Sequence, residues 1–335
     1  MRTVQKEENR DYSFDNLRAV LIICVVFAHL LEIRSPFPFG EDLYRVIYSF
    51  HMPVFLFICG WFAKFDRTKL LLGLFAPYLM LQTAYVFFQR GLYGKDVTLQ
   101  FTTPYWLLWF LLALFFYYLL LPLYDVATPK KRLMAWLLVL ALSLVAGYDS
   151  TVGYGMTLSR LLVFQPWFLL GFYARKTDVK PMPLVGKLLT GLALLACVAV
   201  LCCSSITDNM LYGSYAYEKI QYHAGIRLFL AVVALAWILT FFFVLRPLVN
   251  VRIPLLTRLG QNTLSVFLLH GFIVKYIGYK HPQLLETVIG FLAVVCLILA
   301  LTGNPATAMA LRCLLPEYWA KKLEKKGKPS TRPRK

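Results

Sequence analysis

Long apolar stretches recur along almost the whole chain, and they constrain its fold more than any other feature. Ten of them approach or exceed the roughly 17 to 25 mostly apolar residues that cross a hydrocarbon core of about 30 Å. They lie near residues 15–31, 46–63, 70–89, 105–122, 133–147, 160–174, 185–204, 226–244, 258–277 and 285–303. The composition agrees, because 59% of the 335 residues are apolar and only 16% are charged, whereas a soluble domain carries about 25% charged residues.

These stretches are too long for the short alternating strands of a membrane barrel, so helices are the remaining way to satisfy the backbone in lipid. The predicted fold is therefore all-α, a polytopic integral membrane protein with about ten transmembrane helices. We expect an N-terminal segment at 1–14, a membrane domain at 15–303 and a basic tail at 304–335. The end of the tail, KKLEKKGKPSTRPRK, is expected to be disordered, lying against anionic lipid headgroups or acting only as a topology determinant.

The Lys and Arg residues of the loops predict the orientation, because they concentrate on the cytoplasmic side. Most of them fall on one side when the N-terminus is placed inside, in segments that include Lys130, Arg175 and Arg246. Both termini are therefore predicted to be cytoplasmic, in a multi-pass protein of the plasma membrane. The net charge of +18 then belongs to helix ends that face lipid headgroups, and nucleic acid is not expected as a partner.

Ionisable side chains inside apolar segments are costly in a bilayer, so each is a candidate for function. Arg18 and His29 are 11 positions apart, which places them within roughly 20° of the same helix face and about 16 Å apart along the axis. His51 and His270 fall at a similar depth to His29 when the topology is drawn from charge alone. A single histidine is as readily a packing residue, and Arg18 alone is as readily an interfacial anchor, but three histidines at one level indicate a shared site.

At these residues the sequence resembles the acyltransferase-3 family of integral membrane acyltransferases, particularly fucose O-acetylase-like and cell-surface glycan O-acetyltransferases. The segments that carry the resemblance are the Asp15, Arg18 and His29 pattern, FHMPVFLFICGWF at 50–62, RLLVFQPWFLLGFYARK at 160–176 and LGQNTLSVFLLHGF at 259–272. PYWLLWFLLALFF at 104–116 resembles the tryptophan-rich fourth helix of the same group. The resemblance covers nearly the whole chain.

The resemblance implies transfer of an acyl group, usually acetyl, from cytoplasmic acyl-CoA to a hydroxyl of an extracytoplasmic or lipid-linked glycan. Acetyl-CoA is therefore the expected co-substrate, and its phosphates need cations at the inner interface. Arg18, with Lys64 and Arg67, is expected to bind them. No metal is expected, because the seven cysteines lie in or beside predicted spans without metal-ligand spacing.

The same resemblance suggests roles for the polar residues near the outer side. His29 is the expected general base, since a neutral imidazole can take the proton from a sugar hydroxyl. Glu32 either orients this imidazole or is a loop residue at the outer interface. His51 and His270 are expected to donate to the developing oxyanion or to shape the acceptor pocket.

The acceptor is expected at the outer loop near residues 205–225, where Tyr215 and Tyr217 accompany carboxylates. Aromatic faces with carboxylates suit a sugar, and an interfacial tyrosine belt explains the same residues. Gln165 and Asn262 are polar members of the family-like segments and are further candidates for binding the acceptor.

The main alternative is a transporter or permease for a small polar solute or an acylated glycan, because intramembrane His, Arg and Gln also mark permeation paths. The sequence shows no inverted repeat in support of it. Membrane lipids are expected partners in either case, and an oligomer is compatible with both.

Overall fold

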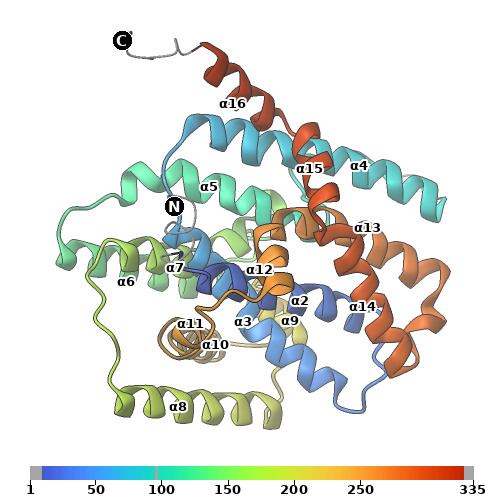
Figure 1. The fold of residues 1–335 in the computed structure, drawn as a ribbon. Coiled ribbons are helices and arrows are strands. Elements are labelled where there is room, and N and C mark those ends of the chain that lie inside the picture. Colours follow the sequence, from blue (N-terminus) through green and yellow to red (C-terminus); the bar gives the residue numbers. More distant parts are fainter. Residues whose placement is uncertain (1–9, 95–96, 328–335) are drawn as a thin grey trace, which may run out of the picture.

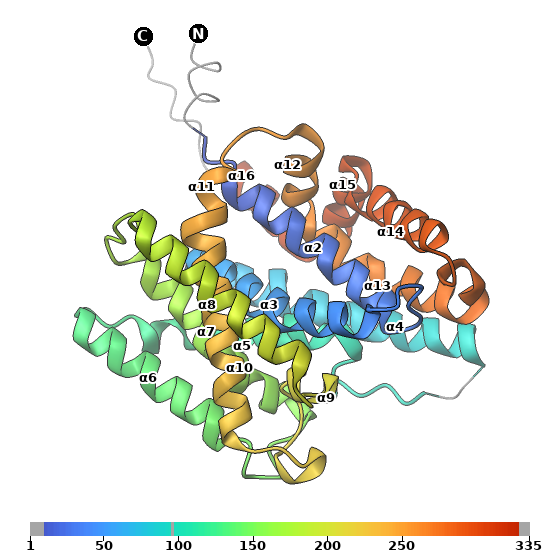
Figure 2. The ribbon, with the colours of Figure 1, turned by 90° about the horizontal axis from the view of Figure 1, so that it is seen from below.

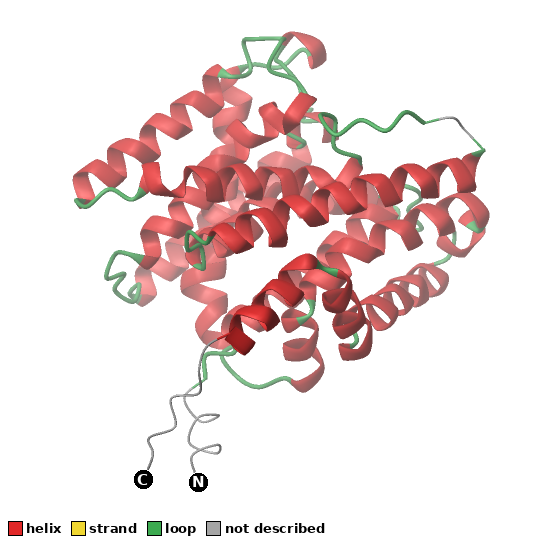
Figure 3. Ribbon diagram, turned by 90° about the horizontal axis from the view of Figure 1, so that it is seen from above, coloured by secondary structure: helices red, strands yellow, loops and turns green. Residues whose placement is uncertain are grey.

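The computed structural model describes residues 10–94 and 97–327, and every regular element in these ranges is a helix (Figure 1). Figure 3 shows that loops serve only to connect these helices. The first elements are α2 (Ser13–Leu31), α3 (Gly40–Trp61), α4 (Ala76–Tyr93), α5 (Trp109–Tyr124), α6 (Pro129–Val145) and α7 (Leu158–Arg175). They are followed by α8 (Leu184–Cys203), α9 (Asp208–Leu211), α10 (Ala224–Leu239), α11 (Arg246–Leu248), α12 (Pro254–Gln261), α13 (Thr263–Lys280), α14 (Val288–Gly303), α15 (Pro305–Leu314) and α16 (Pro316–Gly327).

Within the described residues, six helical stretches are long and apolar enough to cross a membrane, and a bent pair of helices makes a seventh if the pair is counted as one span. The six are Ser13–Leu31, Gly40–Trp61, Lys69–Tyr93, Trp106–Tyr124, Leu184–Cys203 and Ala224–Leu248, and the pair is α14 with α15, bent by 53°. Two of these stretches contain π-helical turns, at Lys69–Phe75 and Thr240–Leu245. The prediction of an all-α membrane fold is therefore confirmed.

The predicted count of ten spans, in contrast, stays a prediction. The three remaining segments are helical, but they are shorter, more polar or broken: α6 has 17 residues, α7 carries arginines near both ends, and α12 and α13 are separated at Asn262. The cytoplasmic placement of the termini also stays a prediction, and residues 1–9 and 328–335 lie outside the described ranges.

Several helix ends that are far apart in sequence meet at one side of the molecule, which we call the N-terminal face. Phe14 at the start of α2 packs on Trp61 at the end of α3, with ring centroids 5.5 Å apart. Arg246 at the start of α11 lies 4.5 Å above the Phe14 ring. Arg175 at the end of α7 donates to the carbonyl of Trp61 at 3.1 Å. The opposite ends of α2 and α3, and the start of α7, form the other face.

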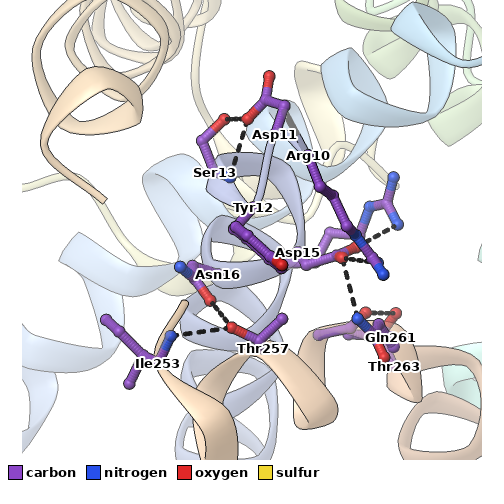
Figure 4. A network of polar contacts seen from close by, with 12 residues as sticks. Arg10, Asp11, Tyr12, Ser13, Asp15, Asn16, Ile253, Thr257, Gln261 and Thr263 are labelled. Atoms are coloured by element: carbon purple, nitrogen blue, oxygen red, sulfur yellow. Dashed lines mark hydrogen bonds and ion pairs between the residues drawn. The ribbon is translucent and has the colours of Figure 1, made fainter. Parts of the chain in front are cut away.

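A buried polar network fastens α12 to the start of α2 (Figure 4). The Asn16 amide donates to the carbonyls of Val249 and Val251, both at 2.8 Å, and the Thr257 hydroxyl donates to the Asn16 amide oxygen at 2.8 Å. Gly260 brings the two backbones together, because a Cβ there would lie 1.7 Å from the carbonyl oxygen of Asp15. These bonds satisfy polar groups that would otherwise be costly to bury.

Helices α3 and α7 approach each other through a reciprocal pair of glycines, which we call the glycine clasp. A Cβ at Gly60 would lie 1.9 Å from the carbonyl oxygen of Phe168, and a Cβ at Gly171 would lie 2.0 Å from that of Phe57. Small residues of this kind let membrane helices pack backbone to backbone, where dispersion contacts replace the hydrophobic effect. The clasp therefore fixes the spacing of α3 and α7.

The segment expected to be a basic tail begins with ordered structure. Residues 305–327 form α15 and α16, and α16 contacts the π-helical turn at Lys69–Phe75 through Glu317, which lies beside Gly73. Lys321–Gly327, which the sequence assigned to a disordered end, continue α16 because a Pro at its N-terminus and a Lys321–Glu317 ion pair favour the helix.

We expect the substitution Gly171→Ala to destabilise the protein, because its methyl group would overlap the Phe57 carbonyl. Overpacking of this kind costs about 1 to 3 kcal/mol. Gly91→Ala is the matched control, since a Cβ at that helical position meets nothing within 4 Å. Thermal unfolding in detergent, followed by tryptophan fluorescence, should show a lower midpoint for Gly171→Ala only. Equal midpoints for the two variants would contradict the clasp.

Candidate active site

A cavity of about 530 Å³ extends along α2 between the two faces. Arg18, Phe62 and Lys69 line it toward the N-terminal face, and His29, Arg160 and Tyr215 line it toward the other. The middle is mostly apolar, with side chains such as Val25, Phe55, Phe110, Leu114 and Phe267. Because Arg18 and His29 are about 16 Å apart along α2, one elongated molecule can reach both.

His29 lies in a shell of polar and aromatic side chains. Its Nδ1 atom is 3.3 Å from Oε2 of Glu32 and 3.4 Å from the hydroxyl of Tyr48. The ring centroid lies 4.5 Å from that of Trp106 and 5.5 Å from that of His270. A carboxylate only accepts, so the Glu32 contact places the proton on Nδ1 and leaves Nε2 able to accept one.

The pKa of Glu32, which follows the end of α2, lies below its ordinary value. Burial alone would raise this pKa, but the hydrogen bond and charge of His29 outweigh the burial, with help from the charge of Lys275 and a hydrogen bond from Trp106. The Nζ atom of Lys275 lies 4.1 Å above the Trp106 ring. Glu32 is therefore a carboxylate at neutral pH and a suitable partner for His29.

The structure brings His270 beside His29, with ring centroids 5.5 Å apart, and His51 lines the same cavity as His29. In both residues Nδ1 lies 2.8 Å from the backbone carbonyl four positions earlier. A carbonyl only accepts, so Nδ1 carries the hydrogen and Nε2 is a bare acceptor in the neutral ring. Nε2 of His270 is buried without a hydrogen-bond partner among the described residues. These bonds leave neither neutral ring a hydrogen for an oxyanion. His51 lines the cavity, whereas His270 packs on His29 without lining it.

Arg160 at the start of α7 is a cavity residue that the sequence analysis did not single out. Its Nε atom donates to the carbonyl of Tyr212 at 3.0 Å, and its guanidinium lies 4.8 Å from the Trp109 ring and 5.3 Å from the Tyr154 ring. No ion pair holds Arg160 within the described part of the chain. A charged residue at the edge of an apolar segment was the available signal. The structure makes Arg160 a fixed cation near the His29 end of the cavity.

Two cations line the cavity near the N-terminal face. Arg18 lies 3.5 Å from Asp15 and 4.8 Å from the Phe62 ring, and Asp15 also pairs with Arg10 at 2.8 Å (Figure 4). Asp15 is thus shared between two arginines, and Arg18 retains positive charge for a ligand. Lys69 donates to the Tyr118 hydroxyl at 2.7 Å.

Two of the three residues predicted to bind the phosphates of acetyl-CoA lie outside the cavity. Lys64 and Arg67 are exposed and do not line the cavity, whereas Lys69, which the sequence analysis did not select, does.

The structure brings one of the four predicted acceptor residues to the cavity. Tyr215 lines it, whereas Tyr217 is buried and donates to a backbone carbonyl of α6 at 2.6 Å. Gln165 donates to a tyrosine hydroxyl of α5. Asn262 donates to the carbonyl at the end of α14 at 3.0 Å. The last three side chains therefore hold helices and loops together.

Comparison with known proteins places the chain among acyltransferases. The sequence model of a family described as "Acyltransferase domain" matches residues 11–303. The nodulation protein NolL of Sinorhizobium fredii is 27% identical over 301 residues, which cover 80% of this chain and 79% of that protein. NolL of Mesorhizobium japonicum is 28% identical over 187 residues, covering 49% of this chain and 48% of that protein. No solved structure gives a significant match.

We expect the stabilising contact of Glu32 with His29 to depend on pH. The pKa of Glu32 is lowered in the folded protein, so its contribution is complete above the unfolded value, about 4.3, and is lost as the pH falls through the folded value. The unfolding midpoint of the native chain should exceed that of Glu32→Gln at pH 5, and the difference should shrink as the pH is lowered below about 4. A difference that is unchanged between pH 5 and pH 3 would contradict the assignment.

Proposed function

Because the chain belongs to the acyltransferase-3 family and is therefore an acyltransferase, we propose that it is a membrane O-acetyltransferase. It moves acetyl from cytoplasmic acetyl-CoA to a hydroxyl of an extracytoplasmic or lipid-linked glycan. The observation that carries the proposal is the cavity along α2, with cations at one end and the His29–Glu32 pair at the other.

In this proposal ten helices cross the plasma membrane, and the N-terminal face is cytoplasmic. Support for this orientation comes from the cations at that face, among them Arg10, Arg175, Lys176 and Arg246, since Lys and Arg concentrate on the cytoplasmic side. Both termini are then inside the cell, and the His29 end of the cavity opens toward the outside.

The donor enters from the N-terminal face in the proposed reaction. Arg18 and Lys69 bind phosphate oxygens of CoA, for which charge-assisted hydrogen bonds are well suited. The extended pantetheine arm lies along the apolar middle of the cavity. Its length lets the thioester reach the level of His29 while the nucleotide remains at the cytoplasmic interface.

The acetyl group transfers by attack of the acceptor hydroxyl on the thioester carbonyl carbon. Nε2 of His29 takes the hydroxyl proton as the C–O bond forms, and Glu32 stabilises the imidazolium that results. The C–S bond then breaks, and the thiolate of CoA takes the proton from His29. The products are an acetyl ester and free CoA, so no further reactant is required.

Arg160 is the candidate group that stabilises the oxyanion or holds the acceptor in this scheme. Its Nε bond to Tyr212 and its stacking on Trp109 fix the guanidinium before substrate arrives. Donors that are fixed in advance stabilise developing charge without reorganisation. Tyr215 supplies an aromatic surface beside it for a sugar ring.

The reaction and the orientation can be tested together in sealed membrane vesicles. We expect inside-out vesicles supplied with labelled acetyl-CoA to incorporate label into glycan, and right-side-out vesicles to do so only after permeabilisation, because CoA does not cross lipid. A vector-only vesicle is the control. A permease would leave acetyl-CoA intact in both preparations, which would overturn the proposed reaction.

The substitution Arg18→Gln should raise the KM for acetyl-CoA with a smaller change in kcat. Loss of a charge-assisted contact of about 1.5 to 3 kcal/mol corresponds to roughly ten-fold to over a hundred-fold. Arg258→Gln is the matched control, because Arg258 is a cation of α12 that does not line the cavity. An unchanged donor KM in Arg18→Gln would make Arg18 an interfacial anchor only.

The substitution His29→Gln should reduce kcat by about 10² to 10⁴, the usual contribution of a general base, with acetyl-CoA binding retained. His281→Gln, in a loop away from the cavity, should keep full activity. Rates are measured by CoA release and donor binding by calorimetry. Wild-type turnover in a folded His29→Gln protein would rule out His29 as the base.

A further inference from the structure

A second cavity of about 340 Å³ lies at the N-terminal face and shares no lining residue with the candidate active site. It sits where the end of α3, the start of α8 and the segment joining α10 to α11 meet. Its walls combine cations with aromatic rings: Lys180, Lys187, Arg246, Trp61, Phe242 and Phe243.

The cations of this cavity differ in how they are held. Arg246 is fixed, because it pairs with Asp11 at 2.9 Å and lies 5.5 Å from the Trp61 ring and 5.0 Å from the Phe242 ring. Lys180 and Lys187, in contrast, have no ion-pair or hydrogen-bond partner for their ammonium groups within residues 10–94 and 97–327. With Asp11 matched to Arg246, the two lysines leave an excess of positive charge that suits an anion.

The surroundings favour an anion that carries apolar chains. Helix α8 begins at this cavity and packs against α10 and α3 (Figure 2), but most of its apolar surface is left uncovered. Leu184, Leu188, Leu192 and Leu195 are all more than half exposed. Leu248 of α11, beside the cavity residue Pro247, is 70% exposed. An exposed apolar surface therefore begins beside Lys180 and Lys187 and continues along α8.

We propose that this cavity binds the phosphate headgroup of an anionic phospholipid, whose acyl chains lie along α8. Lys180 and Lys187 contact the phosphate oxygens, and Arg246 with its aromatic neighbours forms the fixed wall. A cationic pocket at the end of membrane-crossing helices is the usual form of a headgroup site. A free phosphate would use the same cations but not the apolar surface.

The test uses the full chain purified in detergent and mixed with equal amounts of phosphatidylglycerol and phosphatidylcholine. Native mass spectrometry then counts retained lipid. We expect the native protein to retain phosphatidylglycerol preferentially, and Lys180→Gln with Lys187→Gln to weaken retention by about fivefold for each lysine. Lys130→Gln with Lys131→Gln is the matched control, because it removes two exposed cations of α6 outside the cavity.

Three outcomes would overturn the proposal. They are equal retention of the two lipids, equal loss in the control variant, and displacement of phosphatidylglycerol by millimolar inorganic phosphate, which would indicate a site for a soluble anion. Unfolding midpoints verify that the variants fold, and the single change Lys187→Gln serves as a second variant if the double one does not.

Discussion

The glycine clasp between α3 and α7 is the contact on which the candidate site depends most. Helix α3 carries Tyr48 and His51, and Arg160 lies in the first turn of α7. The clasp therefore sets the distance between Arg160 and the two side chains of α3. Gly171 is 11 positions from Arg160, or roughly 16 Å along the helix. A small change in helix crossing at the clasp is therefore enlarged at the His29 end of the cavity. A Cβ at Gly60 or at Gly171 would overlap a backbone carbonyl of the other helix, so the two helices are already in close contact there.

The elements that follow from regular helix geometry were predictable from the sequence. The rise per residue placed His29, His51 and His270 at one level, and the structure brings the rings of His29 and His270 to 5.5 Å. Lys69 was missed because it begins a π-helical turn, where the 3.6-residue period no longer tells which side chain faces inward. Tyr215 and Tyr217 could not be separated, because they lie in an irregular loop whose path depends on tertiary packing.

The number of membrane spans could not be settled from apolar length alone. A segment such as 258–277 is continuous in composition, but Asn262 divides it into α12 and α13 by bonding the end of α14. Local hydrogen bonds distinguish the chemical roles of the three histidines. His29 contacts the carboxylate of Glu32, whereas Nδ1 of His51 and Nδ1 of His270 each contact a backbone carbonyl four positions earlier in the same helix. A carboxylate stabilises an imidazolium far better than a carbonyl does, so the hydrogen-bond partner makes His29 the one suited to take a proton.

The strained backbone of Trp106 helps to hold its ring against His29. Its φ angle is 38°, a left-handed conformation that a bulky residue adopts only when its surroundings impose it, at a cost of order 1 to 3 kcal/mol. Two features of the surroundings account for this conformation. The carbonyl of Trp106 accepts from the Tyr154 hydroxyl at 3.0 Å, and the absence of a side chain at Gly271 leaves room for the indole. The ring is thereby held against His29, while Glu32 and His270 occupy other sides of the imidazole. In the proposed reaction the acceptor hydroxyl then reaches His29 from the cavity, which Arg160 and Tyr215 also line.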